Sequence, residues 1–144
     1  MIRNVTYNNP EIKAEIDQAV GPTFGWLTRI KMKGIGSRRM LIQAASPDLW
    51  HWLDRQNTAK YCYLELRPQG VIVHFRSILE SFAWIIPYRY LSVFQNGKQI
   101  DLHSEGQFMK LTGINNFKAD YQFLKKLMER QSEWRSKYPH VSEI

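Results

Sequence analysis

Hydrophobic and polar positions alternate through the middle of the chain, from residue 61 to residue 76. One side of an extended backbone would collect apolar residues: Cys62, Leu64, Leu66, Val71, Val73 and Phe75. The other side would carry Tyr61, Tyr63, Glu65, Ile72, His74 and Arg76. Because successive side chains of a strand point to opposite faces, this pattern predicts two strands with one buried face. Arg67-Pro68-Gln69-Gly70 between them favours a type I turn with a glycine bulge.

Further strands are expected on the C-terminal side of this pair. Phe82 to Ile86 is apolar and predicts a third strand, which Pro87 would interrupt or place at an edge. Asn96-Gly97 favours a two-residue type I′ turn. The register set by that turn pairs Gln95 with Lys98, Val93 with Ile100, and Leu91 with Leu102. The last two pairs form one apolar stripe, so the turn and the hydrophobic pattern agree. Another strand is expected around residues 107–111.

Three segments carry helix signals. Asn9-Pro10-Glu11 supplies a cap, a proline suited to the first turn and an acid that favours the helix N-terminus, which predicts a helix over about residues 10–20. Ser46-Pro47-Asp48 repeats these signals before a short helix that contains Trp50 and Trp52. A long amphipathic helix is expected over about residues 116–137. Its broad apolar face would be made by Phe117, Tyr121, Leu124, Leu127, Met128 and Trp134, with Phe123 at the margin.

The basic segment RIKMKGIGSRRMLIQ, residues 29–43, is typical of a β-hairpin. Residues 26–32 and 39–43 would be its strands, and the turn over residues 33–38 contains Gly34 and Gly36, which permit positive φ. Its basic side chains could converge on a phosphate-sized site, since Lys offers a point charge and Arg a bidentate fork. The candidate anion-binding residues are Lys31, Lys33, Arg38 and Arg39. The alternative is an ordinary hairpin whose basic side chains form a solvated outer face.

Consecutive antiparallel strands followed by one amphipathic helix predict an α+β fold. We expect a strongly curved antiparallel sheet, or a partly open barrel, of about seven strands closed by the C-terminal helix. Short helices would lie near the N-terminus and after the first hairpin. The 144-residue chain is expected to form a single domain over residues 1–144, with the N-terminal helix at about 10–20 and the main core at about 25–137.

Composition narrows the function classes mainly by exclusion. With 44% hydrophobic and 23% charged residues, the chain has ordinary globular usage and not that of a disordered one. No apolar run is long enough for a membrane span and the N-terminus shows no signal peptide, so a cytoplasmic setting is expected. Cys62 is the one cysteine, which excludes an internal disulfide and a Cys-based zinc site. The formal charge of +7 makes a polyanion, such as nucleic acid or acidic phospholipid, a plausible partner.

Motifs that carry chemistry are weak. The chain has no Walker loop, metalloprotease motif, nucleophile elbow or dinucleotide fingerprint, so no catalytic residue, metal or cofactor is expected. Asp101 and His103 would share a strand face and could bind a metal or orient a base, although a solvated face is the simpler interpretation. Cys62 lies on the predicted buried face, which indicates a structural thiol. An enzyme would need a pocket with convergent polar groups near His74, Asp101 or His103.

The blocks YLELRPQGVIVHFRS and SFAWIIPYRYLSVFQNGKQIDLH, followed by the terminal helix, resemble the bacterial pleckstrin-homology-like (PH-like) domains. The resemblance covers roughly residues 61–137. It rests on a strand pair around a central glycine, on a W-x-I-P-Y segment at residues 84–88, and on the closing helix. It implies that residues 29–43 are the first strand, first loop and second strand. In eukaryotic members of the wider fold this loop often holds inositol phosphates, a part that Lys31, Lys33, Arg38 and Arg39 would play here.

These patterns favour a non-catalytic interaction module of PH-like type that binds protein partners. The contact would use a sheet edge, the margin of the C-terminal helix or the Trp50–Trp52 region. The alternative is a binder of polyanions through residues 29–39, with help from Lys125, Lys126 and Arg130. Homo-oligomerisation is compatible with both.

Overall fold

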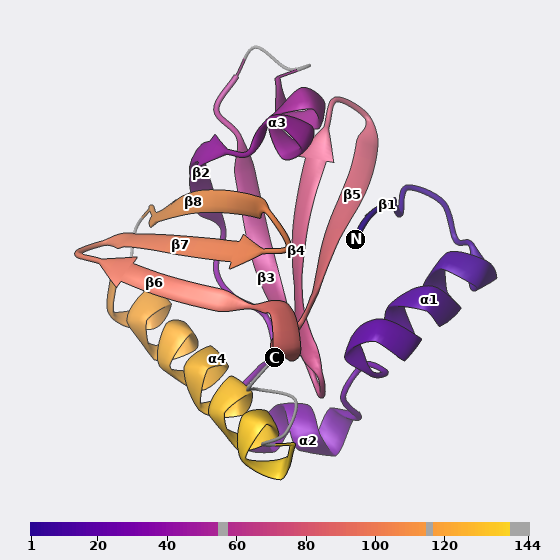
Figure 1. Ribbon diagram of the computed structural model, residues 1–144, viewed down its shortest axis with the longest axis vertical. Helices are drawn as coiled ribbons and strands as arrows, with labels where there is room; N and C mark the ends of the chain where they lie inside the picture. Colours follow the sequence, from indigo (N-terminus) through magenta and orange to yellow (C-terminus); the bar gives the residue numbers. More distant parts are fainter. Residues whose placement is uncertain (55–57, 115–116, 139–144) are drawn as a thin grey trace.

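An antiparallel sheet of eight strands organises the fold (Figure 1). The computed structural model describes residues 1–54, 58–114 and 117–138. The strands are β1 (Ile2–Asn4), β2 (Met40–Ala45), β3 (Tyr61–Arg67), β4 (Gly70–Ser77), β5 (Glu80–Pro87), β6 (Ser92–Asn96), β7 (Gln99–Ser104) and β8 (Gln107–Gly113). The helices are α1 (Pro10–Val20), α2 (Trp26–Lys31), α3 (Pro47–Leu53) and α4 (Phe117–Lys137), and a 3-10 turn, η1, spans Tyr88–Tyr90.

Two meanders meet at β2, which pairs with both β3 and β8. The strand order is β1-β5-β4-β3-β2-β8-β7-β6. The predicted α+β class, the antiparallel sheet and the C-terminal helix are confirmed. The strand count differs from about seven, partly because residues 2–4 add the unpredicted β1 to the edge of β5. Pairing among the described residues leaves β1 and β6 as the edges, so the sheet is open and does not close into a barrel.

The alternating pattern of β3 and β4 is confirmed. Its apolar side packs with Trp84, Ile86 and residues of β2, β7, β8 and α4 in the main core. The turn between these strands differs from the prediction, because Arg67 lies directly opposite Gly70 without a bulge. Gly70 is needed there for space: a Cβ would lie 2.4 Å from the carbonyl oxygen of Ile86.

α1 forms a second, smaller layer on the outer face of the sheet (Figure 1). The Asn9 carboxamide oxygen accepts hydrogen bonds from the backbone N–H groups of Glu11 and Ile12, which confirms the predicted cap. The apolar side of the helix packs on β4 and β5 in a cluster of Ile16, Val20, Ile72, Ala83 and Ile85. Ile72 is therefore buried although it lies on the predicted outer face.

The predicted strand over residues 26–32 and the hairpin over residues 29–43 are wrong. Trp26–Lys31 form α2, and the chain leaves this helix through Lys33 and Gly34, whose φ angles are 59° and 95°. The N–H of Gly34 donates to the carbonyl of Arg29 and closes the helix end. No described strand pairs with residues 26–32, so local helix formation prevails. The apolar side chains of this helix are exposed: Trp26, Leu27 and Ile30.

The β6–β7 hairpin forms at the predicted place with a different register. Val93 pairs with Leu102, and Asn96 pairs with Gln99, which leaves Gly97-Lys98 as the loop. Gly97, with a φ of 60°, occupies the first loop position, as a type II′ turn requires. Each strand partner is displaced by two residues from the prediction, so every side chain keeps its face. The predicted apolar stripe accordingly faces the core: Leu91, Ile100 and Leu102 are buried there, and Val93 packs against them partly buried.

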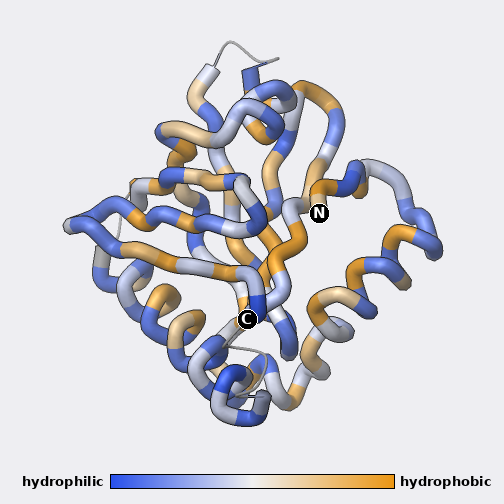
Figure 2. Tube along the Cα trace, viewed as in Figure 1, coloured by the Kyte–Doolittle hydropathy of each residue, from blue (hydrophilic) through white to orange (hydrophobic). Residues whose placement is uncertain are grey.

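α3 and α4 cover the sheet from two further sides, with hydrophobic positions recurring along α4 (Figure 2). Trp50 and Trp52 of α3 are both partly buried against the main core. α4 buries Phe123, Leu124 and Leu127, so its buried face is narrower than predicted and includes Phe123. Residue 116 and the side chain of Phe117, both in predicted positions of this helix, lie outside the described residues. None of the described helices has the length and apolar character needed to cross a membrane.

Candidate functional site

The four residues predicted to bind an anion do not converge. Arg38 and Arg39 precede β2, and their side chains line two different pockets. Arg38 lines a pocket beside α4 together with Lys33. The Arg39 guanidinium lies 4.2 Å from the centre of the Tyr61 ring, on the outer face. Lys31 ends α2 and is exposed.

Lys33 and Arg38 share their pocket with Lys126 of α4. The pocket has a volume of about 400 Å³, and its remaining walls are Gly36, Ser37, Ala119, Gln122 and Phe123. The Lys126 ammonium donates a hydrogen bond of 3.0 Å to the Gly34 carbonyl. Burial lowers the pKa of Lys126, and the nearby charges of Arg130 and Lys33 lower it further. An anion bound among these cations would relieve their mutual repulsion.

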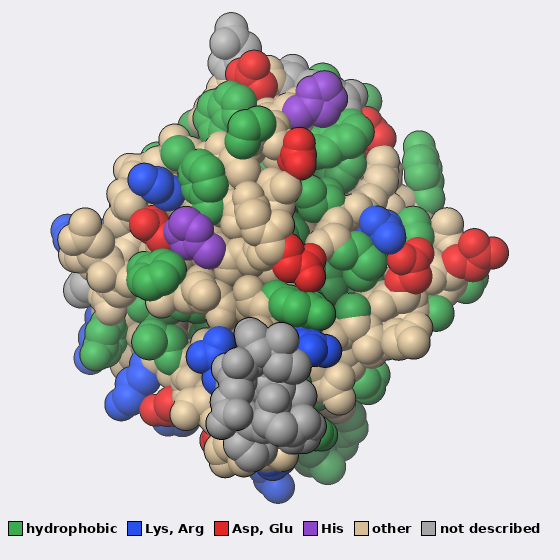
Figure 3. Space-filling view, viewed as in Figure 1, with side chains coloured by type: hydrophobic (Ala, Val, Ile, Leu, Met, Phe, Trp, Pro, Cys, Tyr) green, Lys and Arg blue, Asp and Glu red, His purple; other side chains and the backbone are tan. Residues whose placement is uncertain are grey.

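Asp120 limits how much of this positive charge is available. Its side chain is 4% exposed, and Oδ1 has no hydrogen-bond partner among the described residues. Burial raises the pKa of Asp120, and the charge of Arg38 opposes that shift. When ionised, the Asp120 carboxyl therefore offsets part of the charge of Arg38. In the view of Figure 3, Lys and Arg side chains are spread over several parts of the surface, some of them over α4, and do not gather in one patch.

A groove separates β6 from α4, which lie side by side in Figure 1. Its volume is about 420 Å³, and it is lined by Gln95, Tyr121, Leu124, Lys125, Met128, Glu129 and Ser132. Tyr121 and Met128 are 49% and 48% exposed, so the apolar wall of the groove is open to solvent. The sequence pattern assigned both to a buried helix face. On the helix, both residues lie at the margin of that face, away from Leu124 and Leu127. This position was the one sign in the sequence that they could be exposed.

The outer edge of β6 runs along this groove. The pair Asn96–Gln99 closes a two-residue loop and is a hydrogen-bonded pair. Pairs of the two kinds alternate along the strands, so Gln95–Ile100 and Val93–Leu102 are non-hydrogen-bonded pairs. The backbone N–H and C=O groups of Val93 and Gln95 consequently point away from β7. Gln95 also lines the groove. The start of the strand is held by α4, because the Gln131 side-chain amide donates a 2.6 Å hydrogen bond to the carbonyl of Leu91.

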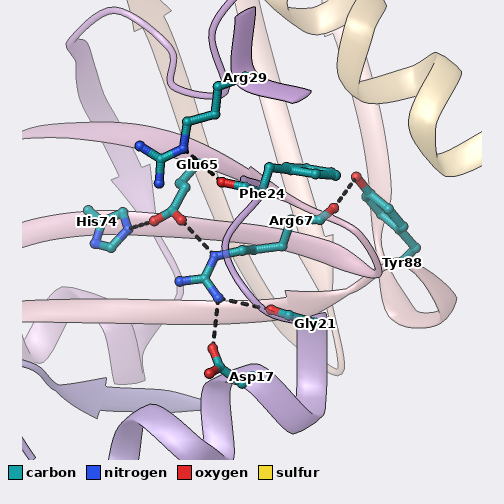
Figure 4. Close-up of polar contacts among 8 residues, drawn as sticks. All are labelled: Asp17, Gly21, Phe24, Arg29, Glu65, Arg67, His74 and Tyr88. Atoms are coloured by element: carbon teal, nitrogen blue, oxygen red, sulfur yellow. Dashed lines mark hydrogen bonds and ion pairs between the residues drawn. The ribbon is translucent and has the colours of Figure 1, made fainter. Parts of the chain in front are cut away.

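A chain of charged side chains crosses the outer face of the sheet (Figure 4). His74 contacts Glu65 at 2.8 Å, and Glu65 accepts a 2.6 Å hydrogen bond from Arg67. Arg67 in turn donates to the Asp17 carboxylate of α1 at 3.0 Å and to the Gly21 carbonyl at 2.9 Å. Burial would raise the pKa of Glu65, but the hydrogen bonds and charges of His74 and Arg67 outweigh it and lower that pKa. Glu65 is thus ionised at neutral pH, and it accepts the His74 Nε2–H.

The other residues that the sequence offered for chemistry, Cys62, Asp101 and His103, are in contacts that stabilise the fold. Cys62 is buried in the core, and burial raises the pKa of its thiol, in keeping with a structural role. Asp101 accepts a hydrogen bond from Gln99, and His103 stacks on Phe108. No cluster suited to a metal occurs within residues 1–54, 58–114 and 117–138. A pocket does lie beside His74, with a volume of about 480 Å³.

Comparisons with protein families, with curated proteins and with solved structures find no match for this chain.

Proposed function

We propose that the protein is a non-catalytic interaction module that binds an extended peptide segment of a partner protein in the groove between β6 and α4. The observation that carries this proposal is the outer edge of β6, which pairs with no described strand, beside a solvent-open apolar wall. A peptide added as a further strand would satisfy the outward backbone groups of Val93 and Gln95. Its alternate side chains would contact Tyr121 and Met128. Strand addition of this kind gives affinity through backbone hydrogen bonds and specificity through side-chain pockets.

The PH-like resemblance remains part of this proposal. Support for it comes from the strand order, in which a meander of β2 to β5 meets a meander of β6 to β8 at β2, and from the position of α4 at the C-terminal end of the chain. β1 and α1 are additions on the far edge and outer face. Neither obstructs the groove, because both contact β5, at the opposite end of the strand order from β6.

Selection of a random peptide library of about 12 residues on the immobilised protein tests the groove directly. We expect enriched peptides with alternating apolar positions, whose addition perturbs the NMR amide signals of β6 and α4. Met128→Glu places a charge on the apolar wall, and Gln95→Pro removes an outward N–H. Each is expected to weaken binding on the order of 10-fold.

Gln95→Ala is the matched control, because it keeps the backbone N–H that proline removes, and it should bind nearly as well as the wild type. Signals that move only outside β6 and α4 would contradict the groove. Concentration-dependent dimerisation in analytical ultracentrifugation, abolished by Gln95→Pro, would indicate that the occupant of the edge is a second copy of this chain.

A second candidate function, anion binding, is favoured by the cluster of Lys33, Arg38 and Lys126. Titration with inositol hexakisphosphate, followed by calorimetry, is expected to give salt-sensitive binding that Arg38→Glu weakens by about 10-fold or more. Arg39→Glu changes the net charge equally but lies on the other side of the sheet, so it should have a much smaller effect. Equal losses for the two variants would mean that net charge alone attracts the ligand.

A further inference from the structure

The outer face of β3, β4 and β5 is divided into two halves. α1 covers the half that contains Ile72, Ala83 and Ile85. Beyond that helix, the same face carries the pocket of about 480 Å³ beside His74. The outward side chains that line it combine aromatic rings with cations: Arg39, Tyr61, Tyr63, His74 and Arg76. Neither the groove of α4 nor the Lys33 pocket shares a lining residue with this site.

The rings on this face are already arranged in parallel or in contact with a cation. Tyr63 and His74 are cross-strand partners, and their rings stack with centres 4.7 Å apart and planes inclined by 15°. The Arg39 guanidinium covers the ring of Tyr61 at 4.2 Å. Tyr63 is nonetheless 49% exposed, so much of its surface remains available to a ligand. Tyr61 and Tyr63 are two residues apart on β3, which separates them by roughly 6.8 Å along the strand.

The chain of charged side chains on this face orients His74 and offsets local negative charge. Glu65 holds Nε2 of His74, and Arg67 holds Glu65 from the other side. Because the Glu65 carboxylate is shared between these two partners, it repels an incoming anion less than an unpaired carboxylate would. Asp17 and Gly21 fix Arg67. The ring stack is therefore preorganised before any ligand binds.

We propose that this face binds single-stranded nucleic acid, with bases stacking on Tyr61, Tyr63 and His74 and with phosphates contacting Arg39 and Arg76. Aromatic rings displayed beside cations on an open surface suit bases that are unstacked and backbones that are anionic. The cations alone would attract an acidic peptide as well as a nucleic acid. The rings favour the nucleic acid, because bases stack on them and a peptide carboxylate gains little from stacking. The formal charge of +7 further favours a polyanion. A base-paired duplex would not present its base faces to the rings.

Fluorescence anisotropy with labelled oligonucleotides of about 12 nucleotides, oligo(dT) and oligo(U), tests the proposal in about 50 and 200 mM salt. We expect binding at the lower salt that weakens at the higher salt. Tyr63→Ala should weaken it on the order of 10-fold, whereas Tyr63→Phe retains the ring and should restore most of the affinity. Arg39→Glu should weaken binding and reduce its salt dependence. Lys98→Glu, in the exposed loop between β6 and β7, changes the net charge equally and is the matched control.

Several outcomes would overturn the proposal. These are no binding of either oligonucleotide at the lower salt, a loss in Lys98→Glu equal to that in Arg39→Glu, and equal affinity for a duplex of the same length. Equal affinity of Tyr63→Ala and the wild type would exclude stacking on this ring. Binding of uridine monophosphate as tight as that of oligo(U) would assign the site to a free nucleotide and would overturn the assignment to a strand. Because Tyr63 is half exposed and outside the core, its truncation leaves the core intact.

Discussion

Replacing Arg67 by methionine is expected to lower the free energy of unfolding by about 3–5 kcal/mol at neutral pH. The Arg67 side chain is 11% exposed and contacts Glu65, whose side chain is 17% exposed. Methionine fills a similar volume but leaves Glu65 buried without its guanidinium partner, and it also leaves the Gly21 carbonyl without its donor. Urea denaturation followed by tryptophan fluorescence and by circular dichroism measures the effect.

Arg3→Met is the matched control, because Arg3 pairs with Glu15 where the two side chains are 38% and 45% exposed. That substitution should cost less than about 1 kcal/mol. Similar losses in the two variants would contradict a special contribution from the buried pair. Arg67 also donates to Asp17 of α1, so the loss in Arg67→Met should be accompanied by faster hydrogen exchange in α1.

The stability gap between Arg67→Met and the wild type should narrow in acid. The pKa of Glu65 is lowered in the folded protein, so Glu65 contributes stability that is present above its unfolded pKa of about 4.5 and is lost as the pH falls through the folded pKa. Removing Arg67 removes one cause of the lowered pKa while burial remains. The wild type therefore loses more stability than the variant below about pH 4.5. If the difference in free energy of unfolding between wild type and variant stayed constant through this pH range, the pH dependence could not be assigned to Glu65.

Replacing Gly70 by alanine is expected to cost about 3 kcal/mol or to prevent folding. The added Cβ would lie 2.4 Å from the Ile86 carbonyl oxygen, 2.5 Å from Cγ1 of Val20 and 3.0 Å from Cα of Pro87. Two of these atoms belong to the backbone of β5, so a rotamer change cannot relieve the clash. The measurements are the midpoints of thermal and of urea unfolding. Both midpoints should be lower in Gly70→Ala than in the wild type.

Gly25→Ala is the control for the alanine substitution itself. Nothing lies within 4 Å of a Cβ built at Gly25, and its φ of −63° suits any residue. Alanine restricts the unfolded chain more than glycine does. Gly25→Ala should therefore leave the free energy of unfolding unchanged or raise it by up to about 1 kcal/mol. If Gly70→Ala unfolded at the same midpoint as Gly25→Ala, the close approach of β4, β5 and α1 at this turn would be wrong.

In β6 and β7 the observed register differs from the predicted one. The turn residues and the hydrophobic stripe agreed on a register, yet the loop is Gly97-Lys98 and the partners are displaced by two residues. Both registers put the same residues on the core side, so the apolar pattern could not distinguish them. The turn type decided between them. For the candidate groove this matters, because the register determines that Val93 and Gln95 have outward backbone groups.

The prediction of a β-hairpin in the basic segment, residues 29–43, was wrong for a different reason. The alternation over residues 26–32 covers a length of only about two helical turns. Only a paired neighbouring strand could have favoured the extended form. Just before β2, Arg38 lines the pocket beside α4, whereas Arg39 covers Tyr61 on the outer face. These two neighbouring residues therefore do not converge on one anion site.

Residue spacing and capping signals alone predicted which side of β3, β4 and β7 faces the main core, where α1 and α3 begin, and that Cys62 is part of the core. Those features depend on residue spacing and on capping residues, which act over a few positions of the chain. Only the tertiary structure decided that α1 covers Ile72 but leaves Tyr63 open, that Met128 borders a groove, and that Lys126 joins Lys33. Periodicity gives the direction of a side chain relative to its own backbone. Which distant element meets that side chain depends on how the layers pack, and this packing creates the three candidate surfaces.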